Sequence, residues 1–214
     1  MPPRAATAHR RTGLRAATIA ARTTSPVTTA SRKRTTKAAG KDMAPPAEGA
    51  VFFWRETETP YGFLSQWYDC PFTVEGETYA STEMWMMVQK ARLFKDEIRE
   101  REMLDTTDPH THRTLGRKVV GYDNRTWNQH KSRIVEEGNW HKFVDKELRE
   151  QLLATGDREL VEASPYDRIW GVGFKAKDAE AKRAQWGENL LGKAIMKVRD
   201  RIRAEQDGQT VEEK

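Results

Sequence analysis

The segment Ser81-Thr-Glu-Met-Trp-Met-Met-Val-Gln-Lys-Ala-Arg-Leu-Phe94 decides the fold, because its spacing predicts a helix that is apolar over most of its surface. Ser81 is a residue type that caps a first helical turn. At about 100° per residue, Glu83 and Lys90 lie on one face, roughly 10 Å apart along the axis. Apolar side chains flank both of them, so a carboxylate and an amine stand in a sector that should face the core.

Burying either ionisable group is costly unless something compensates its charge. Glu83 and Lys90 are too far apart along the helix to form a short ion pair. We therefore interpret them as lining a polar cavity that holds a ligand. The alternative is that Glu97, seven residues after Lys90, completes a stripe of charges on an exposed helix edge.

Turn residues, helix caps and apolar spacing predict the other elements. The predicted extended segments are 51–54, 63–68, a hairpin over 71–79 that turns at Glu75-Gly76, and 160–164. The predicted helices are 109–119, 127–137 ended by Gly138, a helix capped by Asn139 and ended by Gly156, 178–186, and a last one with the apolar stripe Leu191, Ala194, Ile195, Val198 and Ile202. The fold class is therefore α+β, a helix-dominated single domain with a small antiparallel sheet.

The charge of the 214 residues is divided unevenly. Residues 1–46 carry a net charge of +9 and little to bury, so they predict a disordered basic tail, with a mitochondrial transit peptide as one interpretation. Residues 47–206 form the predicted domain, and 207–214 a frayed end. Because residues 47–214 carry a net charge of −4, duplex nucleic acid is not expected to be the domain's main partner.

Several classes of protein are disfavoured by the sequence. The single cysteine, Cys70, cannot form an intrachain disulfide, which indicates a reducing intracellular compartment, cytoplasmic or nuclear, with mitochondria as an alternative. No apolar run reaches the roughly 18 residues that span a membrane. The histidines lack carboxylate or cysteine partners at ligand spacing, so no metal site is predicted. Phosphate-binding loops and the Gly-x-Ser-x-Gly elbow of serine hydrolases are missing too.

The loop Asp167-Arg-Ile-Trp-Gly-Val-Gly173 is the second candidate for chemistry. Gly171 lets the backbone approach another group closely. Asp167 and Trp170 could then act on, and stack against, a flat heterocycle. The alternative is a tight structural turn that Asp167 caps.

The ordered set of these pieces resembles the YbiA-like, or NADAR, family of N-glycosidases over about residues 51–203. The most specific stretch is Leu160-Val-Glu-Ala-Ser-Pro-Tyr-Asp-Arg-Ile-Trp-Gly-Val-Gly173, preceded by Tyr79-Ala-Ser-Thr-Glu83 with Lys90-Ala91 at the family's distance. The other matching pieces are Val51-Phe-Phe, Gly62-Phe-Leu-Ser, Leu115-Gly-Arg-Lys-Val119, Trp127, Lys142-Phe143, Leu153-Ala-Thr-Gly156, Asn189-Leu-Leu-Gly192 and Met196-Lys-Val-Arg199. Gln66 departs from the pattern, since the family often has Asn there.

The resemblance implies hydrolysis of a bond between ribose and a nitrogen heterocycle, without a metal or organic cofactor. The implied substrate is a small molecule, such as a phosphoribosylamino-pyrimidine of riboflavin biosynthesis. One alternative is ADP-ribosylated guanine in DNA or RNA, and another is a non-catalytic module that binds ADP-ribose or nucleotides. The oligomeric state stays open.

The resemblance also assigns roles to residues. Glu83 and Asp167 would be the catalytic carboxylates, and Lys90 either a nucleophile that forms a Schiff base or a contact to phosphate and hydroxyl groups. The expected substrate contacts are Trp170, Gly171, Trp127, Ser65, Gln66, Arg117 and Asn189.

Overall fold

The structure is a computed structural model that describes residues 49–212, with side chains described to residue 208. These residues belong to one unit, Ala44–Lys214. The predictions for the basic tail, residues 1–46, fall outside the described residues.

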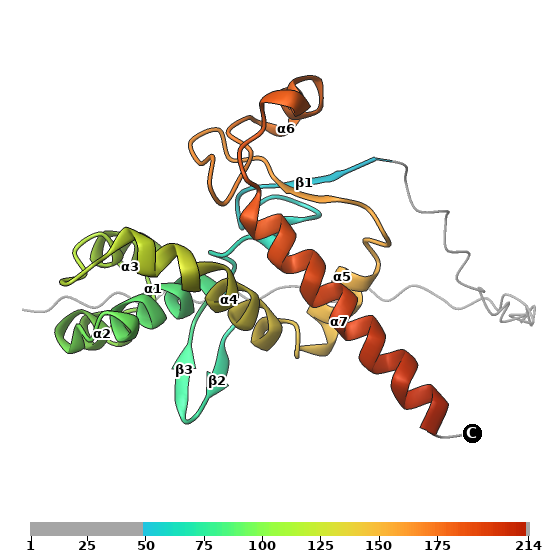
Figure 1. Cartoon of the computed structure of the whole chain (residues 1–214). Helices are drawn as coiled ribbons and strands as arrows, with labels where there is room; N and C mark the ends of the chain where they lie inside the picture. The colour runs from blue at the N-terminus through green and yellow to red at the C-terminus, as the bar shows by residue number, and fades with distance from the viewer. Residues whose placement is uncertain (1–48, 213–214) are drawn as a thin grey trace, which may run out of the picture. The chain divides into compact units, whose positions relative to one another are not determined.

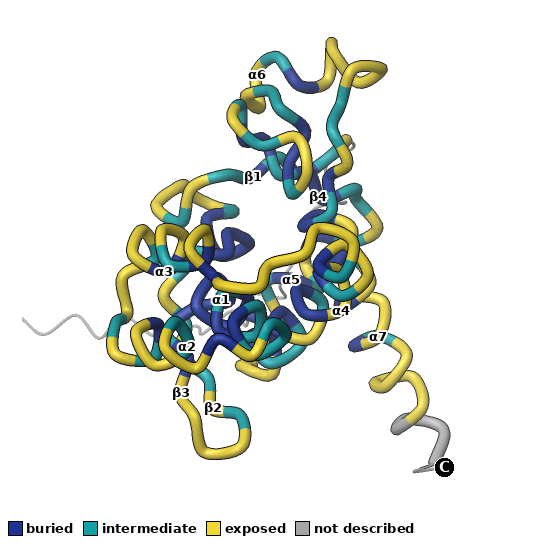
Figure 2. Tube along the Cα trace, turned by 60° about the vertical axis from the view of Figure 1, so that its left-hand side comes forward, coloured by how far each residue is buried: buried dark blue, intermediate teal, exposed yellow. Residues whose placement is uncertain are grey.

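A pair of closely packed helices forms the centre of the core, α1 (Thr82–Leu93) and α4 (Asn124–Lys142). The Ser81 hydroxyl caps α1 by accepting from the Met84 amide at 3.3 Å, as the sequence predicts. The Trp85 indole donates to the Ile134 carbonyl at 2.9 Å, and the ring lies against Gly138 of α4. A Cβ at residue 138 would stand 2.5 Å from the indole, so the glycine permits this close approach. In Figure 2 buried residues gather on α1 and α4.

Of the remaining helices, α2 (Glu97–Leu104) and α3 (Pro109–Gly116) lie between α1 and α4 in the chain, and α5 (Lys146–Leu153), α6 (Ala176–Ala179) and α7 (Leu190–Glu212) follow α4 (Figure 1). The 3-10 helices of the described residues are η1 (Gly62–Leu64) and η2 (Glu180–Gln185). Asp108 caps α3 ahead of Pro109, as predicted. The fold is α+β and dominated by helices, which confirms the predicted class.

The strands form two separate pairs. β2 (Phe72–Val74) and β3 (Glu77–Tyr79) make the predicted antiparallel hairpin, and both turn residues have positive φ, 52° at Glu75 and 88° at Gly76. β1 (Val51–Phe53) instead pairs in parallel with β4 (Leu160–Glu162). The hairpin is the predicted small antiparallel sheet. The parallel pair of β1 and β4 is an addition that the sequence does not predict, because a pairing across more than a hundred residues leaves no local signal.

The register of β1 and β4 sorts their side chains between two cores. Phe53 stands opposite Glu162, and both point toward the main core that contains Val51 and Leu160. Phe52 and Val161 point the other way, into a small second core with Val172, Ala179 and Trp186. In Figures 1 and 2 the segment that includes α6 lies on the side of β1 and β4 away from α1 and α4. Glu162 is thus the polar exception on a face that meets the main core.

Three predictions differ from the structure. Residues 63–68 are not a strand, since η1 and a turn occupy this stretch. Gly138 and Asn139 lie inside α4 and do not end one helix or begin another, and α3 ends at Gly116, short of Val119. The sequence also gives no warning of α2. α7 extends to Glu212, and the frayed end expected from Asp207 stays a prediction.

Two glycines on α7 provide a test of the packing behind β4. A Cβ at Gly192 would collide with the Leu160 carbonyl, and backbone there cannot move aside. A Cβ at Gly208 would meet nothing within 4 Å. We expect Gly192→Ala to lower the free energy of unfolding by about 1–3 kcal/mol, and Gly208→Ala to leave it equal or raise it by up to about 1 kcal/mol. Urea unfolding of both variants measures this, and equal effects would contradict the packing described.

No helix among residues 49–212 is both long and apolar enough to cross a membrane.

Candidate active site

Glu83 lies in the first turn of α1 and is buried, with 5% of its surface exposed. Its amide donates to the Gln66 carbonyl at 2.9 Å, which ties the start of α1 to the preceding loop. The pKa of its carboxyl is raised to about 7, mainly by burial and to a smaller extent by the Asp167 carboxylate, and Arg113 and a hydrogen bond from the Trp67 side chain limit the rise. At neutral pH this carboxyl is divided between its protonated and ionised forms.

The interpretation of Glu83, Lys90 and Glu97 as an exposed stripe is wrong. α1 ends at Leu93, and Lys95 adopts a positive φ of 58°. Glu97 then opens α2 as an exposed residue, while Glu83 is buried. The seven-residue spacing therefore does not continue on one helix.

Lys90 lies two turns further along α1 and is half-buried. Its ammonium donates to the carbonyl of Gly116, the last residue of α3, at 2.7 Å. The nitrogen lies 4.3 Å from the ring centroid of Tyr122 and 5.5 Å from that of Trp127, both within cation–π range. Burial lowers the pKa of this amine. A lowered pKa increases the fraction of neutral, nucleophilic amine.

Asp167 follows β4 and caps its own turn. One carboxylate oxygen accepts from the amides of Ile169 and Trp170, both at 2.8 Å, so the structural-turn interpretation is correct for that oxygen. The same carboxylate raises the pKa of Glu83, which means that the loop and the start of α1 lie within electrostatic range. Asp167 can therefore cap the turn and also act on the charge of Glu83.

Glu162, the last residue of β4, is a third carboxyl in this region that sequence reasoning missed. Burial raises its pKa to about 8, with further contributions from Asp167 and Glu83. We call Glu83, Glu162 and Asp167 the carboxylate cluster. The only available signal was the alternation of side chains in Leu160-Val-Glu162. Successive strand residues face opposite sides, so Glu162 shares the face of Leu160 and not that of Val161. The sequence does not reveal that β4 lies between two cores. The alternation alone therefore cannot tell whether the Glu162 side chain faces the protein interior or solvent.

Residues 52–203 match the NADAR domain. The chain belongs to the NADAR family. It is 38% identical over 160 residues to an N-glycosidase of Acanthamoeba polyphaga mimivirus, covering 70% of this chain and 94% of that protein. The N-glycosidase YbiA of Escherichia coli is 29% identical over 159 residues, covering 74% and 92%.

Two further similarities extend the comparison of this NADAR protein. The NMR structure of Escherichia coli YbiA superimposes with a TM-score of 0.64 at 26% identity, covering 78% of this chain and 92% of that one. A riboflavin biosynthesis protein of Vibrio vulnificus is 30% identical over 156 residues, although the matched part spans 39% of its length. The family resemblance and the α+β fold inferred from the sequence are thereby confirmed.

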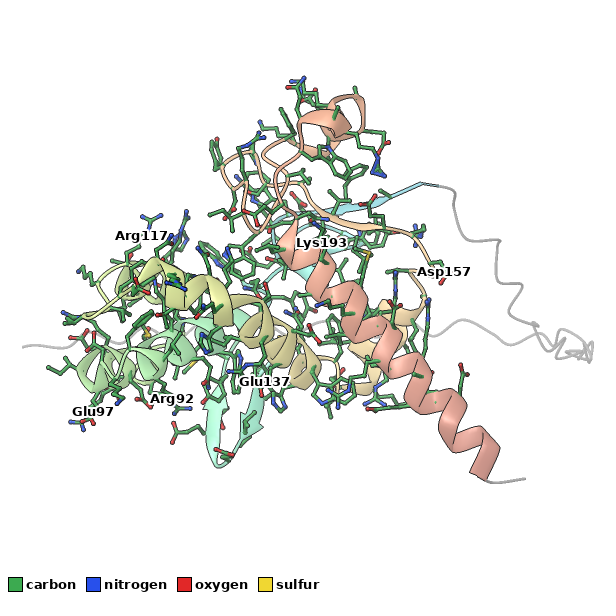
Figure 3. All side chains as sticks on the ribbon, viewed as in Figure 1. Arg92, Glu97, Arg117, Glu137, Asp157 and Lys193 are labelled. Carbon is green, nitrogen blue, oxygen red and sulfur yellow. The ribbon has the colours of Figure 1, made fainter. Side chains whose placement is uncertain are left out.

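Only some of the residues expected to contact substrate lie near the carboxylate cluster or Lys90. Gly171 follows Trp170, which packs on the main core, and Trp127 is buried beside Lys90. Arg117 is exposed at the end of α3 and points outward in Figure 3. Arg113, one turn earlier on α3, is the cation whose charge acts on Glu83.

Three other predicted contacts use their polar groups to hold the protein together. The Ser65 hydroxyl accepts from the Trp67 amide at 3.3 Å. The Gln66 side chain donates to Met86 Sδ and accepts from Asn139, both at 3.5 Å. The Asn189 amide bridges two backbone groups of β4. Direct contacts from these residues to a substrate stay predictions, and the structure gives each of them a supporting role.

The fully buried Lys142 supports the same loop. Its ammonium donates to the Ser65 carbonyl at 2.9 Å, and burial lowers its pKa to about 8. Through Ser65 it holds the loop in which Gln66 accepts from the Glu83 amide and Trp67 hydrogen-bonds the Glu83 carboxyl. Lys142 thus anchors the loop that contacts Glu83.

Two cavities lie elsewhere on the domain. One of about 600 Å³ is lined by Tyr68, Cys70, Phe72, His141, Lys142 and neighbouring residues, and one of about 380 Å³ by Trp54, Arg55, Ala163, Lys175 and neighbouring residues. Neither includes Glu83, Lys90 or Asp167. The prediction that Glu83 and Lys90 line one hollow therefore stays a prediction. Residues 49–212 contain no group of three His, Cys, Asp or Glu side chains arranged to hold a metal ion.

Proposed function

We propose that this NADAR domain is an N-glycosidase, which hydrolyses the bond between a ribose or ribose phosphate and a nitrogen heterocycle. The observation that carries the proposal is the buried Glu83, whose carboxyl has a pKa of about 7 beside Asp167 and lies on the same helix as Lys90. Acids and bases work best when their pKa is close to the working pH. The N-glycosidase names of relatives that are matched over more than nine tenths of their length support the same reaction.

The chemistry follows from the charge that develops on the sugar. Cleavage of an N-glycoside passes through an oxocarbenium-like state, in which positive charge accumulates at C1 of the ribose. The carboxylates of Glu83 and Asp167 stabilise that charge, and Glu83 also accepts a proton from the attacking group. Glu83 is shielded from solvent, which strengthens both effects.

Lys90 has one of two roles in this proposal. As a nucleophile, its amine attacks C1 and forms a Schiff base with the opened sugar. As a contact, its ammonium holds phosphate or hydroxyl groups. Treatment with borohydride during turnover, followed by peptide mass spectrometry, distinguishes the two roles, because only a Schiff base is reduced to a stable adduct on Lys90.

The proposed substrate is a small phosphoribosylamino-pyrimidine, and the name of the Vibrio vulnificus relative supports this class. The alternative within the same chemistry is ADP-ribosylated guanine in DNA or RNA. Assays of the full chain with both substrates side by side decide between them. We expect release of ribose 5-phosphate from the pyrimidine, and release of ADP-ribose alone would favour the nucleic acid. Binding of ADP-ribose without hydrolysis of either substrate, and unaffected by Glu83→Gln, would support a non-catalytic module instead.

We propose a reducing intracellular compartment for this reaction. The single cysteine, Cys70, is a half-buried free thiol, and burial raises its pKa, which disfavours the reactive thiolate. Cytoplasm and nucleus fit equally well, and mitochondria are the alternative. Mass spectrometry of the mature N-terminus decides whether residues 1–46 are removed on import.

A further inference from the structure

We propose that Glu162 is a further catalytic residue, the acid that gives a proton to the departing amino nitrogen of the heterocycle. This inference rests on the proposed N-glycosidase function and adds a group that neither the sequence analysis nor the relatives' names assign.

The backbone of Glu162 is fixed from two sides. Its amide donates to the Asn189 side-chain oxygen at 3.1 Å, and the Asn189 amide group donates to the Leu160 carbonyl at 2.9 Å. Its carbonyl accepts from the Val172 amide at 2.9 Å. A Cβ at Gly171 would stand 2.7 Å from that carbonyl, so the tryptophan-bearing loop can only pack here with glycine at 171. Glu162 therefore has a defined position relative to the Asp167 loop.

Glu162 is a partly buried residue whose carboxyl is incompletely satisfied. Within residues 49–208, its Oε2 is shielded from solvent and has no hydrogen-bond partner. A buried polar atom without a partner is uncommon in a folded protein and needs an explanation. The unpartnered oxygen is explained if it donates a proton to a nitrogen of the bound substrate.

The charges around Glu162 favour its protonated form. The charged groups that act on it are Asp167, from the loop that follows β4, and Glu83, from α1. Among the described side chains, no cation lowers the pKa of Glu162, whereas Arg113 and the Trp67 hydrogen bond lower that of Glu83. At neutral pH Glu162 thus holds a proton while Glu83 is divided between its two forms, and such a difference separates an acid from a base.

The proposed step balances as a hydrolysis. The oxygen of water bonds to C1, and the C1–N bond breaks with both electrons going to nitrogen. The nitrogen takes the proton of Glu162, and ionised Glu83 takes a proton from the water. Exchange with solvent then restores both carboxyls. If Lys90 attacks C1 first, the proton transfer from Glu162 to the nitrogen is unchanged.

The test compares Glu162→Gln with Glu188→Gln, an exposed glutamate that precedes Asn189. With the N-riboside, we expect kcat of Glu162→Gln to fall at least about 100-fold at pH 7, with KM within about threefold of wild type. With a nitrophenyl riboside 5-phosphate, whose leaving group departs without a proton, Glu162→Gln should keep its activity. Glu188→Gln should match wild type on both substrates. Wild-type kcat on the N-riboside, or an equal loss on both substrates, would overturn the inference.

A second measurement does not require the variant to be active. In an NMR titration of glutamate side-chain carbons, the resonance assigned to Glu162 should shift with a midpoint near pH 8. A midpoint near the ordinary 4.5 would overturn the inference, because the group would then hold no proton at neutral pH. Failure of the wild-type protein to cleave any N-riboside would instead refute the proposed function itself.

Discussion

Lys90→Ala should lose at least about 1000-fold in kcat on the N-riboside substrate while the protein stays folded. The amine on α1 has a lowered pKa and lies among Gly116, Tyr122 and Trp127, and alanine can replace neither a nucleophile nor a contact to the sugar. The loss of stability should be modest. One hydrogen bond to the Gly116 carbonyl contributes about 1 kcal/mol, which corresponds to a Tm shift of about 2–4 °C.

The matched control is Lys193→Ala, which removes an exposed lysine near the start of α7 (Figure 3). Steady-state kinetics and thermal unfolding of both variants give the comparison. Turnover of Lys90→Ala within about threefold of wild type would remove this lysine from the mechanism.

Glu83→Gln should inactivate the protein and stabilise it at alkaline pH. The Glu83 pKa rises from 4.5 to about 7 on folding, so the folded state binds its proton more tightly than the unfolded state does. Wild-type stability from this group is therefore complete below pH 4.5 and is lost as pH rises toward 7. The loss above pH 7 amounts to about 3 kcal/mol. Glutamine keeps an acceptor for the Trp67 side chain but never ionises, so it avoids this loss.

Urea unfolding at pH 5 and pH 8 measures this effect. We expect Glu83→Gln to be close to wild type at pH 5 and more stable by up to about 3 kcal/mol at pH 8, with kcat reduced about 100-fold or more. Glu97→Gln, at the exposed start of α2, is the control that should change neither quantity. A variant that is equally or less stable than wild type at pH 8 would show that Glu83 is not held in a buried, uncompensated position.

Local signals in the sequence identified the elements on which these predictions depend. Ser81 and the apolar spacing after it located α1, and Asp108-Pro109 located the start of α3, because caps and periodicity act within a few residues. The placement of Glu83 in a buried sector followed from the same periodicity. The shared environment of Glu83 and Asp167 came from the family resemblance.

Non-local packing explains what the sequence did not reveal. Gly138-Asn139 has the composition of a helix stop, yet the Trp85 ring requires glycine at 138, and the Asn139 side chain donates to the Val135 carbonyl inside α4. The Oε2 atom of Glu162 is shielded only because β4 pairs in parallel with a strand more than a hundred residues earlier. Arg113 acts on Glu83 because α3 packs beside α1, which its sequence does not indicate.

The most direct test of the account is the crystal structure of the full-length Glu83→Gln variant with a bound phosphoribosylamino-pyrimidine. We expect C1 of the ribose to lie between residue 83 and the ammonium of Lys90, with the heterocycle against Trp170 and the C1–N bond facing Glu162. A ribose seated instead in the cavity beside Lys142, or at any site that Glu83 and Lys90 do not reach, would contradict it.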